Sequence, residues 1–253
     1  MTVGSLFSGI GGFDLGMIRA GHQVLWFCES DPFCRTILAK HWPTIPCYED
    51  IRTLNADTVA RPDCLIGGPP CQPVSHAGPQ RGVKDDRFLW TEALALGRNL
   101  GCRYQLYENP PALLTIDGGR VFGALLGSLA QSGHTCEWRC LRASDFGAPH
   151  QRDRVWIVAY PHRTGLEGRA VLPERAGELP AWKGGVVSGF FDAPIERVWI
   201  TEPRLGRTIS HGVPKRVDRL KSLGNAVVPQ MAEWLGERLT AHAEDPHADT
   251  RQG

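Results

Sequence analysis

Short apolar segments alternate along this chain with segments of helical periodicity, and this alternation constrains the fold more than any other feature. The apolar segments are rich in Val, Ile, Leu and aromatic residues, and they predict strands near 3–7, 24–28, 63–67, 103–107, 135–141 and 154–160. The periodic segments predict helices at 12–21, 31–41, 87–100 and 120–132. Strands that alternate with helices are typical of a parallel sheet with crossover helices. The sequence therefore predicts a doubly wound α/β fold.

The amino-acid composition of the chain changes after residue 160. Between 161 and 214, 14 of 54 residues are Gly or Pro, against 48 of 253 overall, and no long periodicity survives. This composition predicts a small, loop-rich region. An amphipathic pattern at 225–241 predicts a helix, so we interpret 215–243 as a segment that returns to the first domain (1–160) and 244–253 as a polar tail.

Charge and hydropathy exclude some locations and partners. No basic segment followed by a long apolar run begins the chain, and no stretch reaches the roughly 20 apolar residues that span a bilayer, so we expect a cytoplasmic protein without a membrane partner. The net charge is +1, but residues 150–221 hold 13 basic and 8 acidic side chains, a local excess of +5. Such an excess favours contact with phosphates, although charged runs are usually solvated faces.

The cysteines indicate free thiols. Nothing in the sequence calls for an oxidising compartment, and no CxxC pair is present, so we expect reduced thiols and no structural metal. The eight residues are Cys28, Cys34, Cys47, Cys64, Cys71, Cys102, Cys136 and Cys140.

The distinctive residues follow predicted strands, where doubly wound sheets bind their ligands. After the first strand, the run Ser8–Gly12 would let a ligand approach the backbone at a helix N-terminus. Glu29 lies 20 residues beyond Gly9, where an acid binds ribose hydroxyls. This pattern favours a nucleoside cofactor, and the alternative is a tight turn followed by an unrelated acid.

Cys71 follows two prolines and begins a polar, Gly-containing segment that extends to Arg87. The prolines restrict the backbone before the cysteine, and the polar segment is suited to close over a substrate. A cysteine in general is more often a small core residue. A Pro-Pro-Cys-Gln-Pro loop is a poor place to bury one, and we therefore interpret Cys71 as a nucleophile.

Two further segments place charged groups at strand ends. Glu108 and Asn109 end an apolar strand, where the carboxylate would either cap the next helix or take part in chemistry. Arg152 and Arg154 flank an acid before the strand at 154–160. They are either solvated edge charges or two cations on one face that need an acceptor, for which a substrate is one candidate.

Taken together, five segments resemble the motifs of the DNA cytosine-5 methyltransferases. They correspond in order to that family's cofactor loop, nucleophile motif, acid motif, paired-arginine motif and final cofactor motif, and they span nearly the whole chain. The segments are Leu6–Phe13, Pro70–Gln72, Glu108–Asn109, Gln151–Arg154 and Gly224–Val228. The run Gly212–Lys221 further resembles the phage and prophage members. The resemblance implies a Rossmann-like S-adenosylmethionine-dependent methyltransferase fold, with 161–214 as a small target-recognition lobe.

The resemblance also implies a mechanism. Cys71 would add to carbon 6 of a cytosine flipped out of double-stranded DNA, Glu108 would act at ring nitrogen 3, and Arg154 would contact the carbonyl oxygen while Arg152 helps to hold the site. S-adenosylmethionine would contact Phe7, Ser8, Gly9, Ile10, Gly11, Gly12, Glu29, Asp50, Ile51, Pro70, Leu89, Asn225 and Ala226. The expected DNA contacts are Gln72, Ser75, Arg204, Lys215 and Arg216.

Two residues depart from the family's usual pattern. Pro110 stands where valine is more common, and Ser30 stands where many relatives have an aromatic side chain that stacks on adenine, so activity or cofactor affinity is expected to be reduced.

Three other functions are the alternatives to a DNA cytosine-5 methyltransferase. The first is an RNA cytosine-5 methyltransferase, whose Cys-Phe-Thr signature is absent from 161–214. The others are a non-catalytic DNA-binding module and a Rossmann oxidoreductase. We expect a monomeric DNA methyltransferase.

Overall fold

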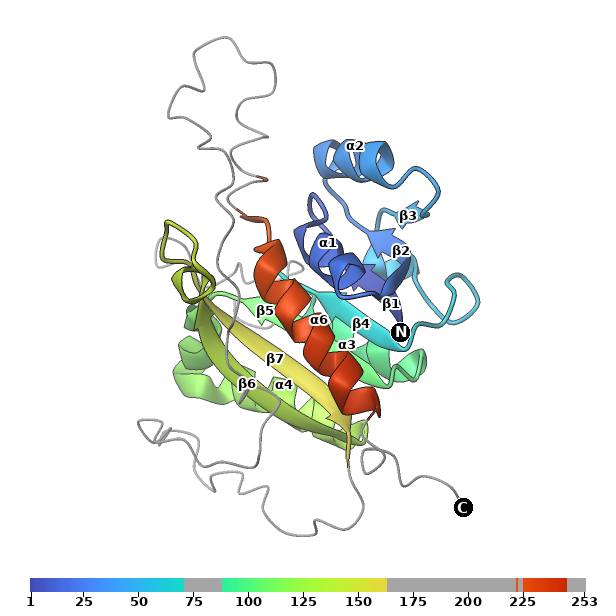
Figure 1. Ribbon diagram of the computed structural model, residues 1–253. Coiled ribbons are helices and arrows are strands. Elements are labelled where there is room, and N and C mark those ends of the chain that lie inside the picture. The colour runs from blue at the N-terminus through green and yellow to red at the C-terminus, as the bar shows by residue number, and fades with distance from the viewer. Residues whose placement is uncertain (71–87, 163–221, 223–224, 245–253) are drawn as a thin grey trace.

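The computed structural model describes residues 1–70, 88–162, 222 and 225–244 (Figure 1). Helices and strands alternate within these residues as the sequence predicts. The strands are β1 (Thr2–Leu6), β2 (Gln23–Cys28), β3 (Cys47–Tyr48), β4 (Cys64–Gly67), β5 (Tyr104–Asn109), β6 (His134–Arg142) and β7 (Asp153–Pro161). The α-helices are α1 (Gly12–Arg19), α2 (Pro32–His41), α3 (Trp90–Asn99), α4 (Arg120–Gln131) and α6 (Pro229–Glu244). Short 3-10 helices lie at η1 (Ile51–Thr53), η3 (Pro111–Gly119) and η4 (Ala143–Phe146).

The strands form one mixed sheet in the order β3-β2-β1-β4-β5-β7-β6. From β3 to β5 all neighbours are parallel, which confirms the α/β class. The expectation of a parallel sheet is wrong at the other edge, where β7 runs antiparallel to both β5 and β6. Residues 143–152, which join β6 to β7, hold only the short η4, and a parallel pair would need a crossover of a dozen or more residues.

Helices cover both faces of the sheet (Figure 1). Side chains of α1, α2 and α6 share one buried cluster with one face, and side chains of α3, α4 and η1 share another with the opposite face. Burial of these apolar surfaces is the main favourable term in folding. Because the helices occupy the faces, the ends of the strands are left as the edge where loops gather.

Close packing of α1 on α6 brings the C-terminal motif to the first loop. A Cβ on Gly16 would lie 2.4 Å from the carbonyl oxygen of Pro229, and a Cβ on Gly12 would lie 2.3 Å from that of Val227. Both positions therefore exclude any side chain. This contact explains how residues near 227, distant in sequence, come to lie beside the loop that follows β1.

Several boundaries differ from the predicted ones. β3 has only two residues, too few to produce a periodic signal in the sequence. β5 extends through Asn109, and α6 begins at Pro229 instead of 225, since proline at the start of a helix loses no hydrogen bond. Except for residues 161, 162 and 244, the predicted lobe (161–214) and tail (244–253) lie outside the described residues.

Among the described residues, one stretch, Pro111–Gln131, has the length and composition of a membrane span. It is not a straight helix, because Asp117 and Gly118 have left-handed backbone angles between η3 and α4. Its 12-residue helix α4 is about 18 Å long, shorter than the hydrocarbon core of a bilayer. The apolar side chains of α4, Val121, Phe122, Leu125 and Leu129, are buried in the core. This stretch therefore packs on one face of the sheet.

Candidate active site

The loop after β1 has an unusual backbone. Phe7, Gly9 and Gly11 have φ values of 54°, 55° and 85°, in the left-handed region that glycine tolerates and phenylalanine rarely adopts. The N–H of Ser8 donates to the carbonyl of Cys28 over 3.2 Å, which turns the loop over the end of β2. Helix α1 starts at Gly12, so its free N–H groups face the same edge. A strained loop at a helix N-terminus is a typical ligand-binding arrangement.

Glu29 joins this loop to the segment that follows β2. Its Oε2 accepts a hydrogen bond from the N–H of Gly9, and its Oε1 accepts one from the N–H of Asp31, both over 2.7 Å. An ionised carboxylate has about four acceptor positions, so Glu29 keeps capacity for further donors such as ribose hydroxyls. The two backbone contacts fix the carboxylate at the edge of the sheet.

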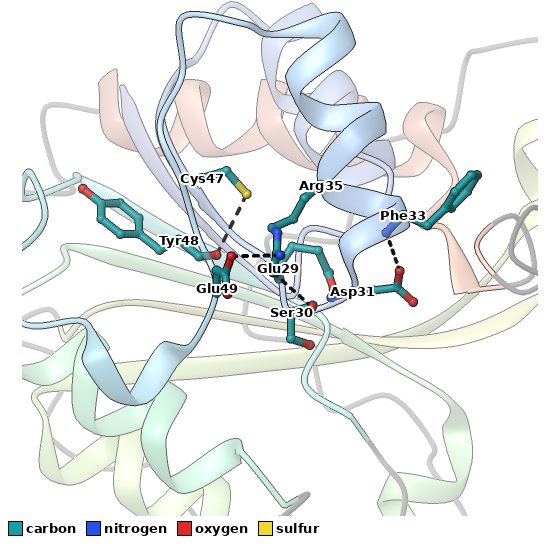
Figure 2. A network of polar contacts seen from close by, with 8 residues as sticks. All are labelled: Glu29, Ser30, Asp31, Phe33, Arg35, Cys47, Tyr48 and Glu49. Carbon is teal, nitrogen blue, oxygen red and sulfur yellow. Dashed lines mark hydrogen bonds and ion pairs between the residues drawn. The ribbon is translucent and has the colours of Figure 1, made fainter.

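The turn that carries Glu29 is held by the start of α2 (Figure 2). Asp31 caps this helix, because its Oδ1 accepts from the N–H groups of Phe33 at 2.9 Å and Cys34 at 3.4 Å. An acidic residue directly before Pro32 is a recognised signal for a helix start, so this cap could have been found from the sequence.

Arg35 clamps the ends of β2 and β3 together (Figure 2). Its Nη1 donates to the carbonyl oxygens of Ser30 at 3.2 Å and Glu29 at 3.4 Å. Its Nη2 forms an ion pair of 2.8 Å with Oε1 of Glu49, which follows β3. The clamp was not predicted, since it depends on a strand, β3, that the sequence does not reveal.

Three predicted apolar cofactor residues come together from distant segments. Ile51 is buried in the cluster below the sheet edge, and Phe7 and Leu89 are half-buried against the same cluster. Asp50, a predicted polar contact, caps η1 by accepting the N–H of Arg52 over 2.9 Å. The loop after β1 thus packs Phe7 against this apolar cluster and donates the N–H of Gly9 to the Glu29 carboxylate.

Glu108 and Arg154 form a buried ion pair at the end of β5. Arg154 Nε lies 2.8 Å from Glu108 Oε1, and the Glu108 side chain is 8% exposed. Glu108 lies opposite Trp156 in the β5–β7 pairing, so Arg154, two residues from Trp156, shares its face. For Arg154, the acceptor that the sequence analysis left open is therefore the protein's own Glu108 carboxylate.

The titration of this pair is set by burial. Removal from water raises the pKa of Glu108, and the charges of Arg154 and then Arg152 only partly offset that rise. Burial lowers the pKa of Arg152, and the neighbouring Arg154 lowers it further, while Glu108 acts in the opposite direction. A carboxyl group with a raised pKa can hold or share a proton near neutral pH.

Asn109 connects this pair to the segment that carries Cys71. Its Nδ2 donates to the carbonyl of Pro69 over 2.7 Å and to that of Glu108 over 3.0 Å. Cys71 itself lies outside the described residues, which end at Pro70. The two bonds of Asn109 hold Pro69, two residues before Cys71 in the sequence, beside the end of β5. Asn109 was named in the acid motif but without a positioning role.

The first turn of α1, directly after the loop that follows β1, also contacts the strand that carries Arg154. The rings of Phe13 and Trp156 meet edge to face, with their centroids 5.3 Å apart. Trp156 lies opposite Glu108 in the β5–β7 pairing. This contact therefore connects the start of α1, which follows the predicted cofactor residues, with the strand pair that carries the predicted catalytic residues Glu108 and Arg154.

The remaining predicted site residues divide into two groups. Asn225 is exposed and Ala226 half-buried directly before Val227, which packs on Gly12. Gln72, Ser75, Arg204, Lys215 and Arg216 lie, like Cys71, outside the described residues. In the part of the chain that the structure describes, no group of three or more His, Cys, Asp or Glu side chains could hold a metal ion.

The chain belongs to the family described as the C-5 cytosine-specific DNA methylases, whose model matches residues 1–184. That match covers the loop after β1 and the Glu108–Arg154 pair, whose geometry is given above, and it also covers the Cys71 segment, which lies outside the described residues.

Individual relatives agree with this family assignment. The chain is 33% identical over 164 residues to the type II methyltransferase M2.BsuMI of Bacillus subtilis, covering 63% of this chain and 42% of that protein. It is 34% identical over 156 residues to the type II methyltransferase M.NgoBI of Neisseria gonorrhoeae, covering 61% and 49%. The chain therefore spans less than half the length of these two curated relatives.

A solved structure is similar as well. A putative DNA modification methyltransferase encoded within a prophage of E. coli superimposes with a TM-score of 0.55 at 27% identity, over 64% of this chain and 47% of that one. The predicted resemblance to the DNA cytosine-5 methyltransferases, including a prophage member, is confirmed.

Proposed function

We propose that this chain transfers a methyl group from S-adenosylmethionine to carbon 5 of cytosine in double-stranded DNA, at a short recognition site. The observation that carries the proposal is the buried Glu108–Arg154 pair, which Asn109 ties to the segment leading into Cys71. Cytosine activation requires a carboxyl group, a guanidinium and a thiol; Glu108 and Arg154 supply the first two, and Cys71, which follows Pro70 in the sequence, is the proposed source of the third. We propose that the chain acts in the cytoplasm of a bacterial or phage-infected cell.

The residues present fit S-adenosylmethionine. The strained loop at Phe7–Gly11 exposes backbone at the start of α1, Glu29 is fixed where ribose hydroxyls can reach it, and Ile51 and Leu89 offer an apolar surface. When bound, S-adenosylmethionine supplies a methyl group on a positively charged sulfur. Phe7, Glu29, Asp50, Ile51 and Leu89 would hold it, with Asn225 and Ala226 closing the site beside Gly12.

Glu108 and Arg154 act on the cytosine ring. The raised pKa of Glu108 lets its carboxyl group share a proton with ring nitrogen 3, which offsets the negative charge that develops when a thiolate adds to the ring. Arg154 would donate one of its N–H groups to the carbonyl oxygen, and Arg152 would add a second positive charge near the site. Because Glu108 and Arg154 are already paired at this position, binding of the base would require only a small rearrangement of the two side chains.

Cys71 supplies the nucleophile. Its sulfur forms a bond to carbon 6, the ring electrons move toward carbon 5, and carbon 5 becomes nucleophilic. Loss of the carbon 5 proton after methylation then breaks the carbon–sulfur bond and restores the ring. The base reaches this edge only after it leaves the duplex, and the segment with Gln72 and Ser75 would close over it.

The other cysteines are poorly suited to this role. The thiolate is the reactive form, and burial raises the pKa of Cys28, Cys102 and Cys136 to about 12. Burial also raises the pKa of Cys47, Cys64 and Cys140. Raised pKa values keep these six thiols protonated at neutral pH, and Cys34 is buried with its Sγ 3.4 Å from Ser222 Oγ. Cys71 is therefore the cysteine that we propose as the nucleophile.

The function is tested by incubating the full chain with tritium-labelled S-adenosylmethionine and duplex DNA, and by bisulfite sequencing of DNA from cells that express it. We expect label in DNA and protected cytosines at a defined site. Label transferred to transfer RNA but not to duplex DNA would favour the RNA-acting alternative, and no transfer to either would contradict the proposal.

Replacing Arg154 with alanine is expected to lower turnover by about 100-fold or more, because the carbonyl oxygen loses a charged donor. Affinity for duplex DNA and its salt dependence should change little, since the Nε of Arg154 is paired with Glu108 and the arginine side chain is only 21% exposed. Steady-state kinetics and a salt titration of binding measure both. Arg142→Ala, at an arginine whose side chain is 62% exposed, is the matched control. Weaker binding to all sequences with turnover preserved at saturating DNA would assign Arg154 to the phosphates.

The recognition site is expected to hold no more than about four strictly specified base pairs. The region at 161 to about 205 offers few cations that could reach base edges, namely Arg163, Arg169, Arg175, Lys183, Arg197 and Arg204. Each bidentate base contact contributes about 1–3 kcal/mol of discrimination, so two or three contacts define a short site. Genome-wide sequencing of methylated cytosines determines the recognition sequence. A strictly specified site of six or more base pairs would contradict the prediction.

A further inference from the structure

Two segments that the proposed function assigns to the cofactor leave the sheet from neighbouring strands. Glu29 follows β2 directly, and Asp50 follows β3 after one intervening residue. β3 pairs with β2 over only two residues, Cys47 and Tyr48, and one further backbone bond of 2.9 Å joins the N–H of Glu29 to the carbonyl of Tyr48. The strand ladder ends at this bond, so contacts beyond it determine how the two segments lie.

Arg35 contacts both segments. Figure 2 shows its side chain extending from α2 to Glu29, Ser30 and Glu49. The backbone of Arg35 is itself fixed, because its N–H donates to the carbonyl of Asp31 over 3.0 Å. The Glu49 side chain is 73% exposed, and an ion pair with such a partner contributes little free energy. The contacts of Arg35 with the two backbone carbonyls are therefore the more important ones.

One of these carbonyl contacts acts on the Glu29 carboxylate through a single peptide unit. Nη1 of Arg35 donates to the carbonyl oxygen of Ser30 over 3.2 Å. The N–H of the same peptide belongs to Asp31, and it donates to Oε1 of Glu29 over 2.7 Å. Because this peptide is trans, its C=O and N–H point in opposite directions. Arg35 thus orients the peptide whose N–H holds the carboxylate.

We propose that Arg35 is a positioning residue: it orients the Ser30–Asp31 peptide and thereby fixes the Glu29 carboxylate where the ribose hydroxyls of S-adenosylmethionine bind. The proposal rests on the proposed function, from which the ribose is taken as the ligand of Glu29. The carboxylate has a second anchor, the N–H of Gly9 at 2.7 Å. Without Arg35 the carboxylate would keep its place but lose its fixed orientation, and a ligand that has to restore this orientation binds less tightly.

The shape of the guanidinium explains why this position holds an arginine. Its N–H donors lie in one plane, so Nη1 of Arg35 contacts the carbonyls of Ser30 and, at 3.4 Å, Glu29, while Nη2 pairs with Glu49. Lysine has the same charge on a single nitrogen and cannot reproduce both sets of contacts. Arg35→Lys should therefore weaken cofactor binding although the charge is kept.

Calorimetric titration of the full chain with S-adenosylhomocysteine measures the effect without methyl transfer. Arg35→Ala should raise the Kd at least about tenfold, whereas turnover at saturating S-adenosylmethionine and DNA should change by less than about twofold. Glu49→Gln, which removes only the exposed ion pair, should change the Kd by less than about threefold. Arg61→Ala is the matched control, because Arg61 also donates to a backbone carbonyl, that of Gly101 over 3.0 Å, before β4 and β5 begin.

Hydrogen exchange of the ligand-free chain tests the peptide contact directly. The amide of Asp31 should exchange at least about tenfold faster in Arg35→Ala than in the wild type, because the peptide that carries it is held less firmly. Arg61→Ala should leave this amide unchanged. An Asp31 amide that exchanges at the wild-type rate in Arg35→Ala would contradict the proposed route from Arg35 to Glu29.

A double-mutant cycle separates positioning from a general structural role. In a chain that carries Glu29→Ala, the further change Arg35→Ala should raise the Kd for S-adenosylhomocysteine by less than about twofold, because the carboxylate through which Arg35 acts is gone. An equal effect of Arg35→Ala with and without Glu29 would show that Arg35 does not act through Glu29, and it would overturn the proposal.

The outcomes also separate this proposal from the proposed function. A wild-type chain that binds S-adenosylhomocysteine, with an Arg35→Ala variant that binds it equally well, overturns the role of Arg35 alone. A wild-type chain that does not bind S-adenosylhomocysteine overturns both. Circular dichroism checks the folding of each variant, and Arg35→Lys gives the same comparison where Arg35→Ala fails to fold.

Discussion

Replacement of Cys71 with serine is expected to reduce methyl transfer by more than about 1,000-fold, because a hydroxyl is a far weaker nucleophile than a thiolate. The fold and S-adenosylmethionine binding should remain, since the exchange is small and Cys71 follows the segment that Asn109 holds at Pro69. Tritium transfer to duplex DNA measures the first effect, and calorimetric titration with S-adenosylhomocysteine measures the second.

A covalent trap makes this expectation specific to the thiol. In DNA that contains 5-fluorocytosine, fluorine replaces the carbon 5 proton and cannot be lost as a cation. The carbon–sulfur bond therefore remains, and the wild-type chain should migrate with the DNA on a denaturing gel. Cys71→Ser should give no such band, whereas Cys47→Ser, a change at a partly buried thiol of β3, should still give it. A trapped complex with Cys71→Ser would show that another group attacks the base.

The fold class and the location of the candidate site could both be predicted from the sequence. Apolar runs and helical periodicity identify the elements, and in a doubly wound sheet residues directly after strands meet at one edge. This reasoning predicts that Gly9, Glu29 and Glu108 lie at that edge. It holds for these three residues because β1, β2 and β5, which lead to them, all run parallel within the sheet.

Pairing partners could not be predicted in the same way. The antiparallel position of β7 between β5 and β6 depends on which strands lie side by side, and local periodicity contains no such information. For the same reason the acceptor of Arg154 appeared to be missing, whereas it is Glu108, 46 residues earlier in the sequence. The clamp of Arg35 on Glu49 also depends on the unpredicted strand β3.

Asp14 is a buried acid that the sequence pattern does not explain. It lies in the first turn of α1 and is fully buried, and neither of its carboxyl oxygens has a hydrogen-bond partner of normal geometry among the described residues. Burial raises its pKa to about 7, against a smaller opposing effect of Ser5. Asp14 is therefore uncharged in the folded chain at mildly acidic pH.

This raised pKa makes folding depend on pH. The unfolded chain loses the Asp14 proton near pH 3.8, whereas the folded chain keeps it up to about pH 7. Between these values the unfolded state binds fewer protons, so the contribution of Asp14 to the free energy of unfolding falls as pH rises. The slope is about 1.4 kcal/mol per pH unit, which gives a loss of about 4 kcal/mol across the interval.

Asp14→Asn is expected to remove this loss, because asparagine has nearly the same shape and no proton to release. Relative to the wild type, the variant should gain up to about 4 kcal/mol in free energy of unfolding between pH 4 and pH 7.5. Urea denaturation at a series of pH values measures the difference. Asp57→Asn, which removes an exposed carboxyl group, is the matched control. A difference between Asp14→Asn and wild type that stays constant with pH would mean that Asp14 is ionised in the folded chain, and its burial would then require a partner from the remaining residues.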